Sequence, residues 1–189
     1  MINVLAADSK SIEKEIAAAK EMLKDVSGGF EQAVRRSLNR AATSARAGIT
    51  KAVREEYTPK PKYIRRDMKV KKANKRVLEA SVHVFGAPLP LRAFSFRPTT
   101  DTTGNVRKPV RVAVQKEGGL KRLGASFVWN GLILKRRGTA SLPVDTVYGP
   151  SVPTMAGRKT VSERIEQTMR SSFIKNLDHE AKYLLRSKK

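Results

Sequence analysis

Residues 30–57, FEQAVRRSLNRAATSARAGITKAVREEY, form the longest amphipathic pattern in this chain of 189 residues. Apolar side chains recur at steps of three or four, which places them on one face of an α-helix; they are Val34, Leu38, Ala41, Ala45, Ile49 and Val53. Thr58-Pro59 ends the pattern, because a residue before proline disfavours the helical conformation. At ~1.5 Å per residue the stretch predicts a helix about 40 Å long, enough to cross a small domain.

Helices are also predicted on both sides of this stretch. The first has an apolar stripe that ends at Gly28-Gly29 and consists of Ile12, Ile16, Ala19, Leu23 and Val26. Near the other end of the chain, Thr160 and Glu163 have the spacing of a capping box. A second stripe follows it to about Leu185 and consists of Val161, Ile165, Met169, Phe173, Leu177 and Ala181.

Between these helices the apolar period changes from helical to alternating, as is typical of strands. The alternating positions are Met68 and Val70, then Leu78, Ala80, Val82 and Val84, then Val110, Val112 and Val114. Asn130-Gly131 predicts a tight hairpin turn, because both of its central residues need a positive φ. We therefore expect paired strands near residues 125–129 and 132–136.

The order of helices and strands predicts an α+β fold, with the long N-terminal amphipathic helix and the C-terminal helix packed on a mostly antiparallel sheet. The length suits a single domain over 1–189 with a real core. We expect four regions within it: a helical region 1–57, a β-sheet region 63–136, a proline-containing connector 139–158 and a C-terminal helix 160–186.

The chain is strongly basic, with a formal net charge of +22 and a sequence pI near 10.7. Residues 30–76 hold fifteen Lys or Arg and four Asp or Glu, so half of that charge, +11, lies in a quarter of the chain. The pattern predicts contact with nucleic acid or with an acidic protein. A solvated helix face is the alternative. The candidate contact residues are Arg35, Arg36, Arg40, Arg46, Arg54, Arg65 and Arg66.

Aromatic residues among these cations have two interpretations, as stacking platforms for nucleic-acid bases or as core residues. They are Tyr57, Tyr63, Phe94 and Phe96. The core interpretation is preferred, because the sequence has neither zinc-finger spacing nor an RNP-like aromatic strand.

Catalysis and metal binding receive little support from the sequence. There is no Cys, and only His83 and His179 offer an imidazole. His179-Glu180 resembles the start of HExxH, but Tyr183 occupies the place of the second histidine. The glycine-rich loop at 117–125 lacks the Lys-Ser/Thr of a phosphate-binding loop. We expect no enzyme activity, no cofactor, no metal and no membrane segment, and hence a soluble product of the cytoplasm.

The segment SLPVDTVYGPSVPTMAG, residues 141–157, differs from the rest because its only charge is Asp145. Its three prolines restrict φ and remove amide donors, so the sequence predicts a stiff, shaped connector. It is either an ordinary ordered loop or a low-entropy apolar surface for a neighbouring subunit. The candidate interface residues are Pro143, Tyr148, Gly149, Pro150 and Pro153.

Several ordered blocks resemble the minor tail protein Z family, the tail-completion proteins of long-tailed phages and prophages. The resemblance covers about residues 30–185. The blocks are SLNRAATSARAGITKAVREEY with IRRDMKVKKA, then APLPLRAFSFRPT, then LPVDTVYGPSVPTM with FIKNLDHEAKYLL. The third block resembles the family's central proline-containing strand, and the last two its C-terminal signature.

The resemblance implies a non-enzymatic virion component, made in the bacterial cytoplasm and added late at the head-proximal end of the tail, near the DNA channel. It implies partners among the tail terminator or tail tube and the head-completion proteins, and a ring of identical subunits, often six. Contact with packaged DNA is implied as non-specific. Cationic helices lining a channel would grip DNA, so we expect part of the charge to face acidic protein neighbours.

Two alternative functions belong to other classes of protein. A free basic nucleic-acid-binding protein explains the charge but leaves the proline-containing segment and the long amphipathic helix without a role. A nuclease-like enzyme needs clustered carboxylates for metal ions, whereas the acids here are scattered or stand beside bases.

Overall fold

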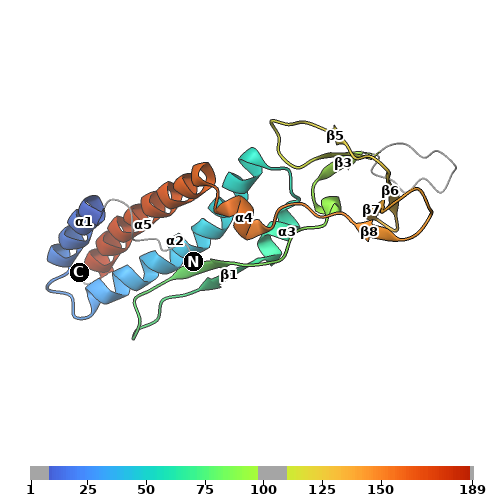
Figure 1. Ribbon diagram of the computed structural model, residues 1–189. Coiled ribbons are helices and arrows are strands. Elements are labelled where there is room, and N and C mark those ends of the chain that lie inside the picture. Colours follow the sequence, from blue (N-terminus) through green and yellow to red (C-terminus); the bar gives the residue numbers. More distant parts are fainter. Residues whose placement is uncertain (1–8, 98–109, 188–189) are drawn as a thin grey trace. The chain divides into compact units, whose positions relative to one another are not determined.

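The computed structural model describes residues 9–97 and 110–187 and confirms the α+β fold class (Figure 1). Its helices are α1 (Ser9–Met22), α2 (Gly29–Glu56), α3 (Pro61–Arg66), the 3₁₀ turn η1 (Leu91–Ala93), α4 (Val152–Ala156) and α5 (Lys159–Ser187). Its strands are β1 (Met68–Lys71), β2 (Ser81–Val84), β3 (Ser95–Arg97), β4 (Arg111–Ala113), β5 (Lys121–Arg122), β6 (Ser126–Trp129), β7 (Leu132–Arg136) and β8 (Val144–Thr146).

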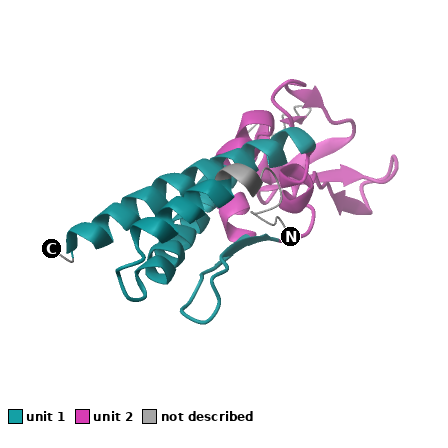
Figure 2. Ribbon diagram, turned by 90° about the vertical axis from the view of Figure 1, so that its left-hand side faces the viewer, with its two compact units in different colours: residues 1–49, 68–84, 159–189 teal, residues 50–67, 85–158 magenta. Residues whose placement is uncertain are grey.

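The chain divides into two compact units, shown in different colours in Figure 2. Unit 1 takes its described residues from 1–49, 68–84 and 159–189, and unit 2 from 50–67 and 85–158. Helix α2 therefore supplies residues to both units. Within the described residues all strand pairs are antiparallel, but the strands form three small sheets, with the orders β1-β2, β3-β4-β5 and β6-β7-β8.

The core of unit 1 is made by α1, α2 and α5, whose apolar stripes meet as their periodicity predicts. The buried members are Ile12, Ala19, Leu23, Ala33, Ala41, Phe173, Leu177 and Ala181. The boundary of α5 differs from the prediction: the helix begins at Lys159, so Thr160 lies in its first turn instead of capping it. Helix α1 ends at Met22, and the turns that follow it carry Val26 into the same core.

A two-stranded ribbon, β1-β2, completes unit 1, with Met68 paired to Val84 and Lys71 to Ser81. The predicted strand at Leu78 and Ala80 is wrong in its start, because β2 begins only at Ser81. The side chain of Asn74 accepts hydrogen bonds from the backbone N–H groups of Arg76 and Val77, at 2.9 and 2.8 Å. Such a side-chain turn competes with strand pairing and keeps this stretch out of the ribbon.

Unit 2 holds the two three-stranded sheets. The β6-β7 hairpin confirms the prediction from Asn130-Gly131, whose φ values are +47° and +69°. Strand β4 covers only the middle of the predicted alternating run, so Val110 and Val114 lie outside it. Helix α3 was not predicted; it begins at Pro61, where a missing amide costs nothing because the first N–H groups of a helix have no partner within it.

The proline-containing connector 139–158 has more regular structure than predicted, since it contains both β8 and α4. Strand β8 pairs with β7, with Asp145 opposite Lys135. Ser151 caps α4, its Oγ accepting a hydrogen bond from the Thr154 N–H at 3.2 Å. Pro153 lies in the first turn of α4, where proline is well tolerated, so here it starts a helix instead of preventing one.

Candidate functional site

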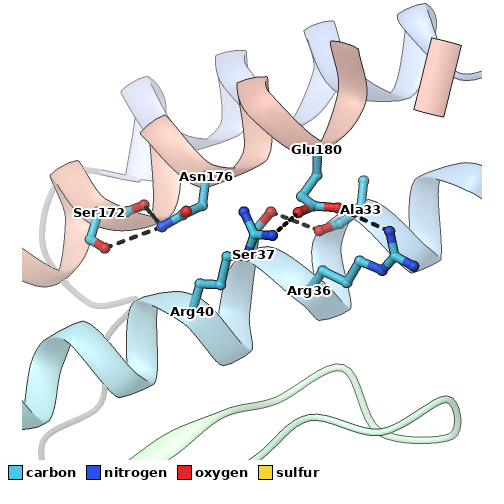
Figure 3. A network of polar contacts seen from close by, with 7 residues as sticks. All are labelled: Ala33, Arg36, Ser37, Arg40, Ser172, Asn176 and Glu180. Atoms are coloured by element: carbon cyan, nitrogen blue, oxygen red, sulfur yellow. Dashed lines mark hydrogen bonds and ion pairs between the residues drawn. The ribbon is translucent and has the colours of Figure 1, made fainter. Parts of the chain in front are cut away.

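The cationic face of α2 contacts a buried carboxylate of α5 (Figure 3). Glu180 is only 2% exposed, and its two oxygens bind two arginines. Arg36 Nη1 lies 3.3 Å from Oε2, and Arg40 Nη2 lies 2.9 Å from Oε1. The two arginines are one helical turn apart, so a single carboxylate can reach both. Two of the seven candidate cations are thus engaged within unit 1.

Hydrogen bonds along each helix surround this ion-pair cluster (Figure 3). The hydroxyl of Ser37, which is fully buried, donates to the Ala33 carbonyl at 2.7 Å. On α5, the Asn176 amide donates to the Ser172 carbonyl at 2.6 Å. These polar groups are therefore satisfied inside their own helices, and the hydrogen bonds and ion pairs that Figure 3 shows between α2 and α5 are those of Glu180.

The other candidate cations are divided between the two units. Arg35 and Arg46 of α2 belong to unit 1, whereas Arg54, Arg65 and Arg66 belong to unit 2. Arg66 donates to the buried carboxylate of Asp67 at 2.7 and 3.3 Å. That hydrogen bond and the charge of Asp67 raise the pKa of Arg66 above its usual value. Arg54 and Arg65 are exposed.

The aromatic residues among these cations fall into two classes. Tyr57 and Phe94 are buried, as the core interpretation predicts. Tyr63 and Phe96 are half-buried and lie beside cations, with Lys60 Nζ 5.6 Å from the centre of the Phe96 ring. Lys62 and Arg66 lie 5.1 and 5.7 Å from the Tyr63 ring. These rings hold charged side chains in unit 2 by cation–π contact.

The proline-containing segment is anchored to residues 89–94 by backbone hydrogen bonds within unit 2. The Gly149 N–H donates to the Leu89 carbonyl at 2.7 Å, and the Leu91 N–H donates to the Val147 carbonyl at 2.9 Å. Gly149 also lies against the fully buried Phe94, so that a Cβ at position 149 would come within 2.8 Å of the ring. The family-like blocks 87–99 and 142–155 are therefore packed against each other in their described parts.

This anchoring separates the five candidate interface residues into two groups. Gly149, Pro150 and Pro153 are half-buried and shape the segment. Pro143 and Tyr148 are exposed, and Tyr148 keeps 58% of its surface accessible. Other large apolar side chains of unit 2 are also exposed; they are Phe85, Leu120, Trp129 and Leu142.

The described residues offer little for catalysis. No group of three or more Asp, Glu or His side chains within residues 9–97 and 110–187 could hold a metal ion. His83 shares a hydrogen bond of 3.0 Å with Ser81 on the same strand. None of the helices in the described part of the chain has both the length and the apolar character needed to cross a membrane.

Sequence reasoning missed Glu180 and the packing around Gly149. Glu180 lies three residues after Leu177, so the helical spacing of the stripe places it on the apolar face of α5. A carboxylate at such a position indicates a cationic partner, because buried charges are paired. For Gly149 the sequence has no equivalent signal, since Phe94 is 55 positions away.

Comparison with family models supplies the decisive observation. The model of prophage minor tail protein Z (GPZ) matches residues 13–189, nearly the whole chain. The chain belongs to the prophage minor tail protein Z family. Neither a curated protein nor a solved structure matches it.

Membership in the minor tail protein Z family makes the chain a structural component of a phage tail, associated with the virion. The match spans both units, so the Glu180 cluster and the proline-containing segment both lie inside it. The sequence-based recognition of the family is confirmed.

Proposed function

We propose that this minor tail protein completes the tail at its head-proximal end, as a non-enzymatic ring of identical subunits close to the DNA channel. The observation that carries the tail role is the family match over residues 13–189. The ring and its position at the neck are proposed because the resemblance to this family implies them, and the exposed surfaces of the subunit are assigned to contacts within that proposal. The expected partners are a second copy of the chain, the tail terminator or tail tube, and the head-completion proteins.

The apolar part of the proposed subunit contact consists of Tyr148 and Pro143. Gly149, Pro150 and Pro153 give the segment its shape: Gly149 packs against Phe94, the Pro150 carbonyl accepts a hydrogen bond from the Leu89 N–H, and Pro153 starts α4. A segment that is already fixed by backbone hydrogen bonds loses little entropy on association. Large exposed aromatic side chains are common anchors of protein interfaces.

The charged contact is assigned to acidic protein neighbours, and contact with packaged DNA is expected only as non-specific. The arginines assigned to it are those at positions 35, 36, 40, 46, 54, 65 and 66. Arg36 and Arg40 already share Glu180. Their cluster has a net charge of +1, because two arginines offset one carboxylate. A row of unpaired cations would bind DNA more strongly than this arrangement does, which favours docking to protein.

The subunit contact is tested with two tyrosines of similar exposure, Tyr148 at 58% and Tyr183 at 54%. Tyr148→Ala is expected to leave the chain folded but to lower its incorporation into particles by roughly tenfold, the loss typical of an interface anchor. Tyr183→Ala, on α5, is the control and is expected to be incorporated normally. The measurement is the amount of the chain in purified particles. Equal incorporation of the two variants would remove Tyr148 from the contact.

The position in the virion is tested on the same particles by electron microscopy with an antibody against the chain. Label at the head-proximal end of the tail is expected. Label along the tube or at the distal tip contradicts the proposed site of action but leaves the tail role intact.

A further inference from the structure

Unit 1 carries a polar depression to which no residue of the proline-containing segment contributes. It is an open hollow of about 420 Å³ lined by Asn39, Arg40, Thr43, Ser44, Lys72 and Asn176. These residues come from α2, from the chain just after β1 and from α5. Two of them are cations and none is an Asp or Glu. We call this hollow the α2 notch.

The backbone that carries Lys72 is fixed to α2 by Asn39. The Asn39 Nδ2 donates to the Ala73 carbonyl at 3.1 Å, and the Ala73 N–H donates to Asn39 Oδ1 at 2.7 Å. This reciprocal pair resembles the pairing of two strands and uses both ends of the amide. Lys72 is therefore attached to the rim of the notch by a fixed backbone, although its side chain is exposed.

Free donors remain in the notch. An arginine has five N–H donors, and Glu180 binds Arg40 through Nη2. Within the described residues Lys72 has no ion pair and the Ser44 hydroxyl has no hydrogen-bond partner. Figure 3 shows Arg40 extending from α2 toward Glu180, which holds its guanidinium in place. A fixed guanidinium with an adjacent ammonium and hydroxyl is suited to an oxyanion.

The charge of the notch favours a single carboxylate over the backbone of duplex DNA. Arg36, Arg40 and Lys72 contribute three positive charges and Glu180 one negative charge, a local sum of +2. Duplex DNA carries one negative charge per ~1.7 Å of axis and is bound by rows of unpaired cations.

We infer that the α2 notch binds an acidic side chain of a neighbouring virion protein, whose carboxylate contacts Arg40, Lys72 and Ser44. The identity of that neighbour as a virion protein rests on the proposed function, whereas carboxylate binding by the notch does not. Arg40 then has two roles, because the same guanidinium joins α2 to α5 and offers its remaining N–H groups to the partner.

The test is a titration of the purified full chain with a decaglutamate peptide. Binding is measured by calorimetry and by changes in the amide NMR signals of Ser44 and Lys72. Lys72→Gln is compared with Lys75→Gln. Lys75 is an exposed lysine three residues further along the chain, and it does not line the notch. Both variants lose one charge. The Kd for decaglutamate is expected to rise about fivefold in Lys72→Gln, the effect of one partly screened charged contact, and less than twofold in Lys75→Gln.

The inference is overturned by equal weakening in the two variants, by the absence of detectable binding, or by unchanged signals from Ser44 and Lys72. A parallel titration with a short DNA duplex separates the two classes of anion. If Lys72→Gln weakens duplex binding more than peptide binding, the notch takes a phosphodiester and the carboxylate assignment fails. Particle incorporation is measured separately, so a failure of the tail-completion proposal is distinguishable from a failure of this site.

Discussion

Units 1 and 2 hold their candidate contact surfaces in place by different interactions. In unit 1, a buried carboxylate, Glu180, joins two arginines of α2 to α5. In unit 2, the proline-containing segment is held by backbone hydrogen bonds to residues 89–91 and by the close approach of Gly149 to Phe94. Asp145 of this segment also forms an ion pair with Arg137, and both side chains of that pair are exposed.

This difference indicates what each surface tolerates. A surface held by tight apolar packing fails when volume is added, because interiors are packed as densely as crystals. A surface held by charges fails when a partner is removed, and the loss is smaller where the remaining charges reach water. The proline-containing segment of unit 2 should therefore be sensitive to added volume, and the α2 face of unit 1 to the loss of the charge at Glu180.

The largest change in the free energy of unfolding is expected from Gly149→Ala in unit 2. The new Cβ would lie 2.8 Å from Phe94 Cε2 and 3.2 Å from Leu91 Cδ2, both on buried side chains. Overpacking of this kind lowers the free energy of unfolding by about 1–3 kcal/mol. Urea unfolding, with hydrogen exchange at the Leu91 and Gly149 amides, measures the change.

Gly138→Ala is the matched control for this substitution, because a Cβ at position 138 meets no atom within 4 Å. Its free energy of unfolding is expected to match that of the wild-type chain or to rise slightly, since alanine restricts the unfolded state. If the two alanine variants are equally stable, close packing at Gly149 does not hold the segment.

A smaller effect is expected from Glu180→Ala in unit 1. The substitution removes two ion pairs and leaves Arg36 and Arg40 as like charges one turn apart. Because the two arginine side chains are 39% and 52% exposed, water partly replaces the lost carboxylate. We therefore expect a loss of only about 1–2 kcal/mol of unfolding free energy, below the value for a fully buried pair. Urea unfolding followed by circular dichroism of the helices provides the measurement.

Two variants sharpen the interpretation of Glu180→Ala. Glu163→Ala, at an exposed position of the same helix, should change stability little. Glu180→Gln keeps the volume and removes the charge, so it should lose most of the same free energy. A Glu180→Gln protein as stable as the wild-type chain would show that the carboxylate fills space and that its charge does not hold α2 to α5.

Features of the fold that depend on local periodicity could be predicted from the sequence. Contacts between residues far apart in the sequence could not. The stripes of α2 and α5 and the Asn130-Gly131 turn follow from spacing and from φ requirements, and the structure confirms them. The seven cations were grouped from their position in the sequence alone. Whether Arg36 faces solvent or Glu180 depends on a residue 144 positions away, and no local pattern contains that information.

The smallest effect on stability is expected from breaking the exposed ion pair of unit 2. In this pair Arg137 donates to both oxygens of Asp145, at 2.6 and 2.9 Å. The hydrogen bond and charge of Arg137 lower the pKa of Asp145 below its ordinary value. A carboxyl group whose pKa is lower in the folded state adds stability above its unfolded-state pKa and loses that stability as the pH falls through the folded-state value. A carbon-13 NMR titration should therefore place the Asp145 midpoint below that of an unfolded peptide, and Arg137→Gln should move it back up. An unshifted midpoint in the wild-type chain would mean that solvent screens the pair completely, so that the segment of unit 2 is held by its backbone hydrogen bonds and by packing, without a contribution from this pair.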